Sequence, residues 1–127
     1  MTVLYEVDTD RNLIRFSVAG PLVVDEVIET VQKAMRRVDR SRPFYDLWDM
    51  SAMTELDGQA KDIERLAHQW ALVGPIRRPP GKTALVATSP YQYGVARMYM
   101  SWLGEQPHWE SRLFRNEDEA QIWLDSN

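Results

Sequence analysis

The sequence predicts a single α/β domain built on a five-stranded mixed sheet, mostly parallel, with an antiparallel strand at the N-terminus. Strand-like and helix-like patterns alternate along most of the chain, which is typical of parallel strands joined by right-handed crossovers. Residues 83–88 are almost all apolar or β-branched, as in a central strand covered on both faces. The 127 residues are enough for one hydrophobic core, so we expect one domain over residues 1–127.

Two strands joined by a turn are predicted first, over residues 3–8 and 13–19. In the second of them apolar side chains occupy every second position, which is the pattern of a half-buried strand. The residues between them are rich in Asp and Asn, whose side chains bond to nearby backbone in turns. Gly20 and Pro21 are expected to end the second strand, because proline has no N–H for a sheet ladder.

Four helices and three further strands follow, giving the order β-β-α-β-α-β-α-β-α. The strands are predicted over residues 44–50, 83–88 and 112–114, and the first two helices over residues 22–39 and 57–73. Both of these helices carry apolar side chains at helical spacing on one face. Ser89 is expected to cap the third helix, with Pro90 at its first position. Asn116 and Glu119 resemble a capping box that opens the last helix.

Composition excludes several classes of function. The formal charge of −4 argues against nucleic acid as the main partner, since phosphate binding needs a basic excess. The absence of cysteine excludes disulfides, thiolate catalysis and iron–sulfur clusters. No apolar run is long enough for a membrane span, and the first residues have no export pattern, so we expect a cytoplasmic protein. No cofactor is expected, because Gly81-Lys82-Thr83 precedes a strand rather than a phosphate-binding helix.

Three segments carry a resemblance to a known family. Asp49-Met50-Ser51-Ala52-Met53-Thr54-Glu55-Leu56-Asp57 resembles the central motif of STAS domains, which is found in anti-sigma-factor antagonists. The stretch from Arg112 to Leu124 is similar to the ending of SpoIIAA-like proteins, which are related to CRAL-TRIO domains, and Gly20-Pro21-Leu22 resembles their strand-to-helix turn. The resemblance implies a single STAS-like α/β domain with a regulatory or carrier role and no established enzymatic activity.

One position departs from that family. In the antagonists a serine after the final aspartate of the motif is phosphorylated by a kinase, whereas here Asp57 is followed by Gly58 and Gln59. Ser51 and Thr54 lie nearby but not at the matching position. We therefore expect no kinase-operated switch, and we expect Asp57 to cap the second helix.

A ligand site is predicted at the carboxyl ends of the strands, where open α/β sheets bind their ligands. The residues expected to line it are Met50, Met53 and Tyr91, with Ser51, Ser89 and Arg115 as polar anchors. Such a lining suits a small apolar or amphipathic molecule.

A protein partner is the other predicted occupant. By the resemblance it would bind at residues 49–59, with Asp57 in contact. On the third helix Tyr93 and Met100 are expected to be exposed on either side of Arg97, a composition typical of interfaces, and the interface it indicates is that of a homodimer. A set of basic residues precedes the third and fourth strands: Arg36, Arg37, Arg40, Arg42, Arg77, Arg78 and Lys82. These side chains either offset the partial negative charge at helix C-termini or form a patch that binds an acidic partner or anionic headgroups.

Catalytic chemistry finds little support. His68 and His108 lie on different predicted elements without a partner, so neither a general base nor a metal site is expected. The carboxylates Asp46, Asp49 and Glu55 are expected to be solvated. The sequence therefore predicts a non-enzymatic binding or regulatory domain. The alternatives are a partner-switching antagonist and an enzyme that uses Asp49 and Asp57.

Overall fold

The computed structural model describes residues 2–73, 78–107 and 109–126, and its elements follow the predicted order. The strands are β1 (Val3–Asp8), β2 (Leu13–Leu22), β3 (Tyr45–Leu56), β4 (Gly81–Val86) and β5 (Trp109–Phe114). The helices are α1 (Val24–Met35), α2 (Ala60–Val73), α3 (Pro90–Leu103) and α4 (Glu117–Asp125). No helix in the described part of the chain is long and apolar enough to cross a membrane.

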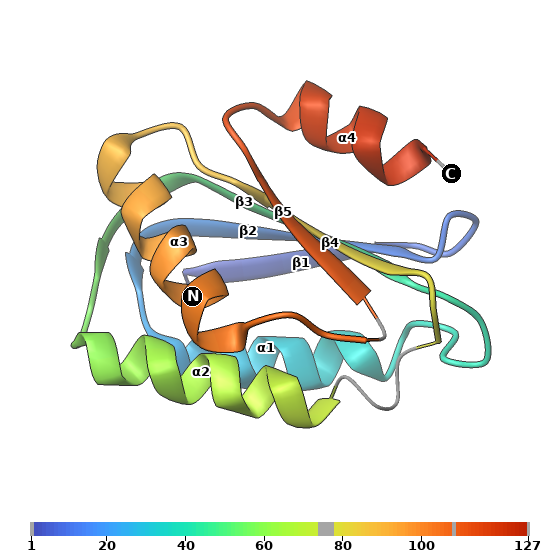
Figure 1. Cartoon of the computed structure of the whole chain (residues 1–127), viewed down its shortest axis with the longest axis horizontal. Helices are drawn as coiled ribbons and strands as arrows, with labels where there is room; N and C mark the ends of the chain where they lie inside the picture. The colour runs from blue at the N-terminus through green and yellow to red at the C-terminus, as the bar shows by residue number, and fades with distance from the viewer. Residues whose placement is uncertain (1, 74–77, 108, 127) are drawn as a thin grey trace.

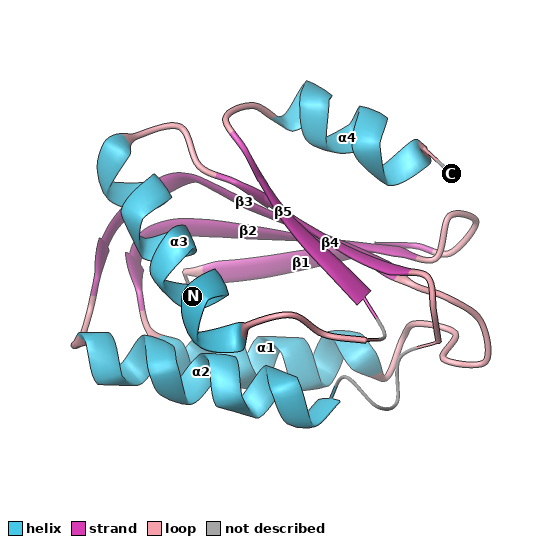
Figure 2. Ribbon diagram, viewed as in Figure 1, coloured by secondary structure: helices cyan, strands magenta, loops and turns pink. Residues whose placement is uncertain are grey.

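The five strands form one sheet in which spatial order equals chain order (Figure 1). β1 pairs with β2 antiparallel, and every other neighbouring pair is parallel, as the sequence predicts. Because each parallel connection steps to the next strand in the same direction, right-handed crossovers place α1, α2 and α3 on one face. α4 follows the last strand and lies on the opposite face (Figure 2).

Each face of the sheet has its own core. Alternation along β3 sends Trp48 and Met50 toward α1, α2 and α3, and sends Leu47 toward α4. β4 is buried along its whole length, because its two faces contribute Leu85 to one core and Val86 to the other. The nearly continuous apolar pattern of this strand follows from that double burial.

β2 and β3 are longer than predicted. β2 continues through Pro21 to Leu22, and β3 continues to Leu56, because these two ends pair with each other beyond the rest of the sheet. The expectation that Pro21 ends β2 is wrong. β1 reaches only as far as Val18, so one side of this part of β2 carries no ladder, and a proline is tolerated there.

The helix ends also differ from the prediction. α1 is shorter at both ends than residues 22–39, and α2 begins at Ala60 rather than at residue 57. Gln59 stands before α2, and its N–H donates to the Asp62 carboxylate over 2.8 Å, so the expectation that Asp57 caps the helix is wrong. The caps of α3 and α4 at Ser89 and Asn116 are confirmed.

Candidate functional site

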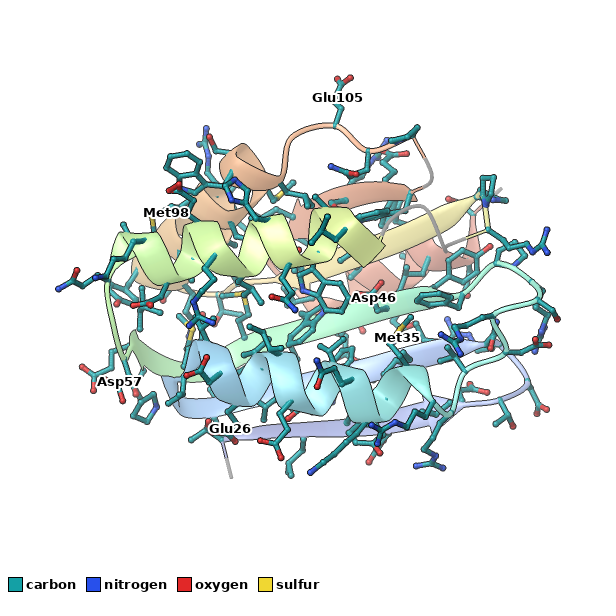
Figure 3. The ribbon with its side chains drawn as sticks, turned by 90° about the horizontal axis from the view of Figure 1, so that it is seen from below. Glu26, Met35, Asp46, Asp57, Met98 and Glu105 are labelled. Atoms are coloured by element: carbon teal, nitrogen blue, oxygen red, sulfur yellow. The ribbon has the colours of Figure 1, made fainter. Side chains whose placement is uncertain are left out.

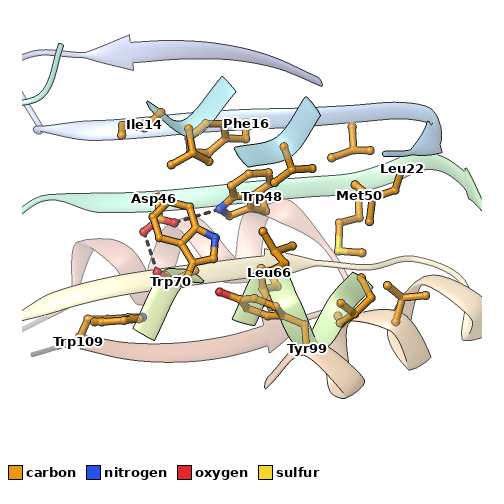
Figure 4. Close-up of a pocket in the computed structure, with 18 of the residues that line it drawn as sticks. Ile14, Phe16, Leu22, Asp46, Trp48, Met50, Leu66, Trp70, Tyr99 and Trp109 are labelled. Carbon is orange, nitrogen blue, oxygen red and sulfur yellow. Dashed lines mark hydrogen bonds between the residues drawn. The ribbon is translucent and has the colours of Figure 1, made fainter. Parts of the chain in front are cut away.

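An apolar cavity of about 70 Å³ lies between the sheet and the helices α1, α2 and α3. Its wall includes the side chains labelled in Figure 4, among them Phe16, Trp48, Met50, Leu66, Trp70 and Tyr99. Phe16 and Trp48 stack with ring centroids 4.0 Å apart, so β2 and β3 present a flat aromatic floor. Three of the five tryptophans of the chain, Trp48, Trp70 and Trp109, belong to this lining.

One carboxyl group belongs to this apolar wall. Asp46 is 8% exposed, and its two oxygens accept hydrogen bonds from Trp48 Nε1 over 3.0 Å and from Thr83 Oγ1 over 2.7 Å (Figure 4). Period-two alternation places Asp46 on the same face of β3 as Trp48, with Thr83 beside it in register on β4. The expectation that Asp46 is solvated is wrong, because only the tertiary fold brings two donors to it.

A groove of about 560 Å³ runs between α1 and α2 outside the cavity. Val31, Met35, Leu66 and Trp70 line both hollows, so the groove and the cavity adjoin at these four side chains. The remaining groove residues are Ile28, Gln32, Arg36, Arg40 and Gln69. Figure 3 looks onto this surface and shows Met35 and Asp46 between the two helices.

Charged contacts hold the helices together at one end of the groove. Arg65 of α2 contacts Asp25 at the N-terminal end of α1 over 2.9 Å, and Asp62 lies 3.7 Å from the same guanidinium. In the described part of the chain, no ion pair joins α1 and α2 nearer to their C-terminal ends. The helices are therefore linked beyond one end of the groove, and its other end leads to Arg36 and Arg40.

The predicted ligand residues do not come together at the cavity. Met50 lines it, but the lining does not include Ser51, Met53, Ser89, Tyr91 or Arg115. Tyr91 Oη accepts a hydrogen bond from the Leu56 N–H, and Ser89 caps α3, so both have structural roles. A site at the carboxyl ends of the strands stays a prediction.

The predicted partner residues lie apart from the groove. Asp57 is exposed after β3, and its N–H donates to the Leu22 carbonyl. Tyr93 is half-buried, with the guanidinium of Arg115 4.5 Å from its ring centroid and that of Arg97 6.0 Å away. Met100 is half-buried against the core. The expectation that Tyr93 and Met100 are exposed is therefore wrong.

A polar cluster occupies the α4 side of the sheet. Arg15 contacts Asp49 over 3.0 Å and Glu117 over 2.6 Å. Burial acts to raise the pKa of Asp49, but the hydrogen bonds from the side chain and backbone of Ser51, together with Arg15, outweigh it and hold the pKa below its usual value. Asp49 lies within β3 and Asp57 after its end, and no hydrogen bond or ion pair among the described contacts joins the two residues.

The histidines form no site in the described structure. His68 is exposed and meets the edge of Trp102, with ring centroids 6.5 Å apart. His108 lies outside the described residues. The described residues contain no group of His, Asp and Glu side chains that could hold a metal ion.

The predicted basic patch is divided. Lys82 is buried and donates to the carbonyls of Trp123 and Ser126, so it does not belong to a surface patch. Arg37 lies over the Tyr5 ring, and Arg42 pairs with Asp39. Arg78 is exposed, and Arg77 lies outside the described residues. Of the described members of this set, only Arg36 and Arg40 line the groove.

The sequence reasoning missed the groove itself. Its α2 wall includes Gln69 and Trp70, and an apolar face on an amphipathic helix does not show by itself how completely a neighbouring helix covers it. The available signal was Met35 followed closely by Arg36 and Arg40. That pattern became informative only when α2 was placed opposite.

Comparison with known proteins establishes the fold. The structure is similar to that of an uncharacterized protein from the DUF3478 family with a SpoIIAA-like fold, from Shewanella loihica PV-4. The TM-score is 0.61 and the sequence identity 16%, over 96% of this chain and 93% of that one. No protein-family model matches the chain, and no curated protein matches it. The chain therefore has the SpoIIAA-like α/β fold that the sequence predicts.

Proposed function

We propose that this protein is a non-enzymatic binding domain that holds a small apolar ligand between α1 and α2. The observation that carries the proposal is that the groove and the apolar cavity share four lining side chains, Val31, Met35, Leu66 and Trp70. A side chain, a chain of methylenes or a ring entering at these residues leaves water and meets an apolar wall. Removing apolar surface from water in this way stabilises the complex by about 25 cal/mol per Å².

The dimensions support a small molecule as the occupant. Pockets for small ligands usually measure about 300–1,000 Å³, and the groove of about 560 Å³ lies within that range. Met35 stands at the junction of groove and cavity, and an unbranched thioether adapts its shape to different ligands. The cavity is small by itself, so the ligand lies mainly in the groove with one end in the cavity.

Regulation by phosphate at the start of α2 is not part of the proposal. Gly58 has a φ of +146°, and a Cβ atom there would lie 2.5 Å from Asp62 Oδ2. Serine at this position would be strained, so the backbone favours the glycine that replaces the family's hydroxyl. We propose that ligand occupancy, rather than a kinase, controls the domain.

The test uses decan-1-ol as a neutral apolar probe, titrated by calorimetry against the wild type and two variants. Met35→Trp fills the junction, and Met98→Trp adds the same ring on α3, away from both hollows. We expect saturable binding that Met35→Trp weakens at least tenfold and Met98→Trp leaves within twofold. Absence of saturable binding by the wild type, or equal loss in both variants, would contradict the proposal.

A protein partner at the end of β3 is the second candidate. β3 continues beyond Asp49, its last residue paired with β4, and exposes Ala52 and Thr54; Asp57, just after the strand, is also exposed. Asp57→Ala should abolish co-purification of a partner from the native host, whereas Asp118→Ala should not. Sedimentation of the same samples would show whether the chain also forms a homodimer.

A further inference from the structure

We infer that the ligand carries an anionic head group, held by Arg36 and Arg40 at the outer end of the groove, with its apolar chain directed into the cavity. This inference rests on the proposed function and names the chemical class of the ligand. A fatty-acid-like carboxylate or a single-chain alkyl phosphate has this chemistry.

The charge of the groove is the first support. Among the described residues of its lining are two arginines and no carboxylate, although the whole chain has a formal charge of −4. Neither Arg36 nor Arg40 makes an ion pair with a described residue, whereas nearby Arg42 pairs with Asp39. Two guanidinium groups on one wall, neither of them ion-paired within the described residues, favour an anion from solution.

The arrangement of polar and apolar groups is the second support. Met35 directly precedes Arg36 and lines the junction with the cavity, so the charged end and the apolar end of the site are adjacent in the chain. Gln32 and Gln69 line the same groove and carry amide N–H groups that can donate to head-group oxygens. This is the order of chemistry along an amphipathic acid.

The inner end of the site sets the orientation. The carboxyl group of Asp46 lies in the cavity wall, and an anionic head placed there would leave water to meet another acid. The opposite orientation brings the head to the exposed guanidinium groups, where water still solvates it. The chain therefore points inward and the head outward.

An alternative role for these arginines is compensation of the negative end of α1. Arg36 is the C-cap residue of the helix, and cations there are stabilising in any protein. Such a role would change folding stability without discriminating between charged and neutral ligands. The two roles therefore separate in a binding experiment with matched probes.

The experiment titrates decanoate, decyl phosphate and decan-1-ol by calorimetry against three forms of the full chain. The test variant is Arg36→Gln/Arg40→Gln. The control is Lys33→Gln/Arg37→Gln, which removes two positive charges from the same end of α1 at positions outside the groove lining. Unfolding in denaturant confirms that both variants are folded.

We expect the test variant to bind decanoate about tenfold more weakly than the wild type does, since each exposed charged contact contributes roughly a factor of three in affinity. Its affinity for decan-1-ol should stay within twofold, and the control should stay within twofold for all three probes. Tighter binding of decyl phosphate than decanoate, with the same dependence on the arginines, would assign a phosphate head; the reverse would assign a carboxylate.

Two results would overturn the inference, and they have different meanings. If decan-1-ol binds but decanoate responds equally to the test and control variants, the anionic head is wrong and the apolar site stands. If none of the three probes binds the wild type, the proposed function fails together with the inference. Raised ionic strength should weaken the binding of decanoate but not that of decan-1-ol, which gives an independent check.

Discussion

At the scale of single residues, Gln92 joins α3 to the unpaired edge of β3. Its side chain is buried, and its Nε2 donates to the carbonyls of Ser51 and Met53 over 3.1 and 2.9 Å. Its Oε1 accepts from the N–H groups of Thr88 and Ser89. One side-chain amide thus provides hydrogen-bond partners for the backbone of β3 and for the connection between β4 and α3, where no strand pairs with this part of β3.

Gln92→Ala is expected to lower the free energy of unfolding by about 2–4 kcal/mol, because buried carbonyl and N–H groups would lose their partners. Chemical denaturation at neutral pH measures this. Gln32→Ala on the exposed surface of α1 is the control and should change stability by less than about 0.5 kcal/mol. Equal effects of the two substitutions would show that the bridge contributes nothing.

Asp49 makes the folding stability of the protein depend on pH. Its pKa is held below the usual value by Ser51 and Arg15, against the effect of burial. A carboxyl group with a lowered folded-state pKa contributes stability that is fully present above its unfolded-state pKa and is lost as pH falls through the folded-state pKa.

Asp49→Asn should therefore cost about 1 kcal/mol at pH 7, and the cost should shrink as the pH falls below about 4. Denaturation midpoints between pH 7 and pH 3 measure this difference. Asp10→Asn, at an exposed turn position, serves as the control and should show no such convergence. A cost for Asp49→Asn that is independent of pH would contradict the assignment.

At the scale of elements, the β3–α2 junction depends on the backbone of Gly58. Because of its φ of +146°, Gly58→Ala should destabilise the protein by about 1–3 kcal/mol. Gly94 lies within α3 with open space around it, so Gly94→Ala should instead stabilise by about 0.5–1 kcal/mol. Thermal unfolding of the two variants should shift in opposite directions, and shifts of the same sign would contradict this account.

α4 covers its face of the sheet through one side of a short helix. Leu124 is 4% exposed and packs with Leu47 and Val86, whereas Ile122 is 71% exposed. Leu124→Ala should cost about 2–4 kcal/mol, and Ile122→Ala less than about 0.5 kcal/mol. If chemical denaturation gave similar costs for both, α4 would not be docked on the sheet in this orientation.

At the scale of the whole molecule, an occupied groove should stabilise the fold by mass action. Decan-1-ol at 100 times its dissociation constant should raise the free energy of unfolding by about 2.7 kcal/mol, because the unfolded chain has no site. Denaturation in increasing concentrations of the probe measures this, and Met35→Trp should remove most of the effect. Stabilisation that persists in Met35→Trp would place the ligand elsewhere.

Much of the fold follows from local patterns. The order of elements, the antiparallel first pair and the helix starts at Ser89 and Asn116 depend on alternation, helical spacing and capping, which are properties of neighbouring residues. The end of β2 was predicted wrongly, because whether Pro21 can lie in a strand depends on which side of that strand is paired.

The candidate site was largely decided by tertiary structure. Alternation along β3 puts Asp46 on the same face as Trp48, which donates to it, but the second donor, Thr83, lies 37 residues away and is brought beside it only by strand pairing. The sequence places Met35 and Trp70 on amphipathic helices, but the gap between α1 and α2 depends on how the two helices pack over one sheet. Local patterns thus determined which residues are apolar and which elements they form, and only the packing of those elements decided where a hollow remained.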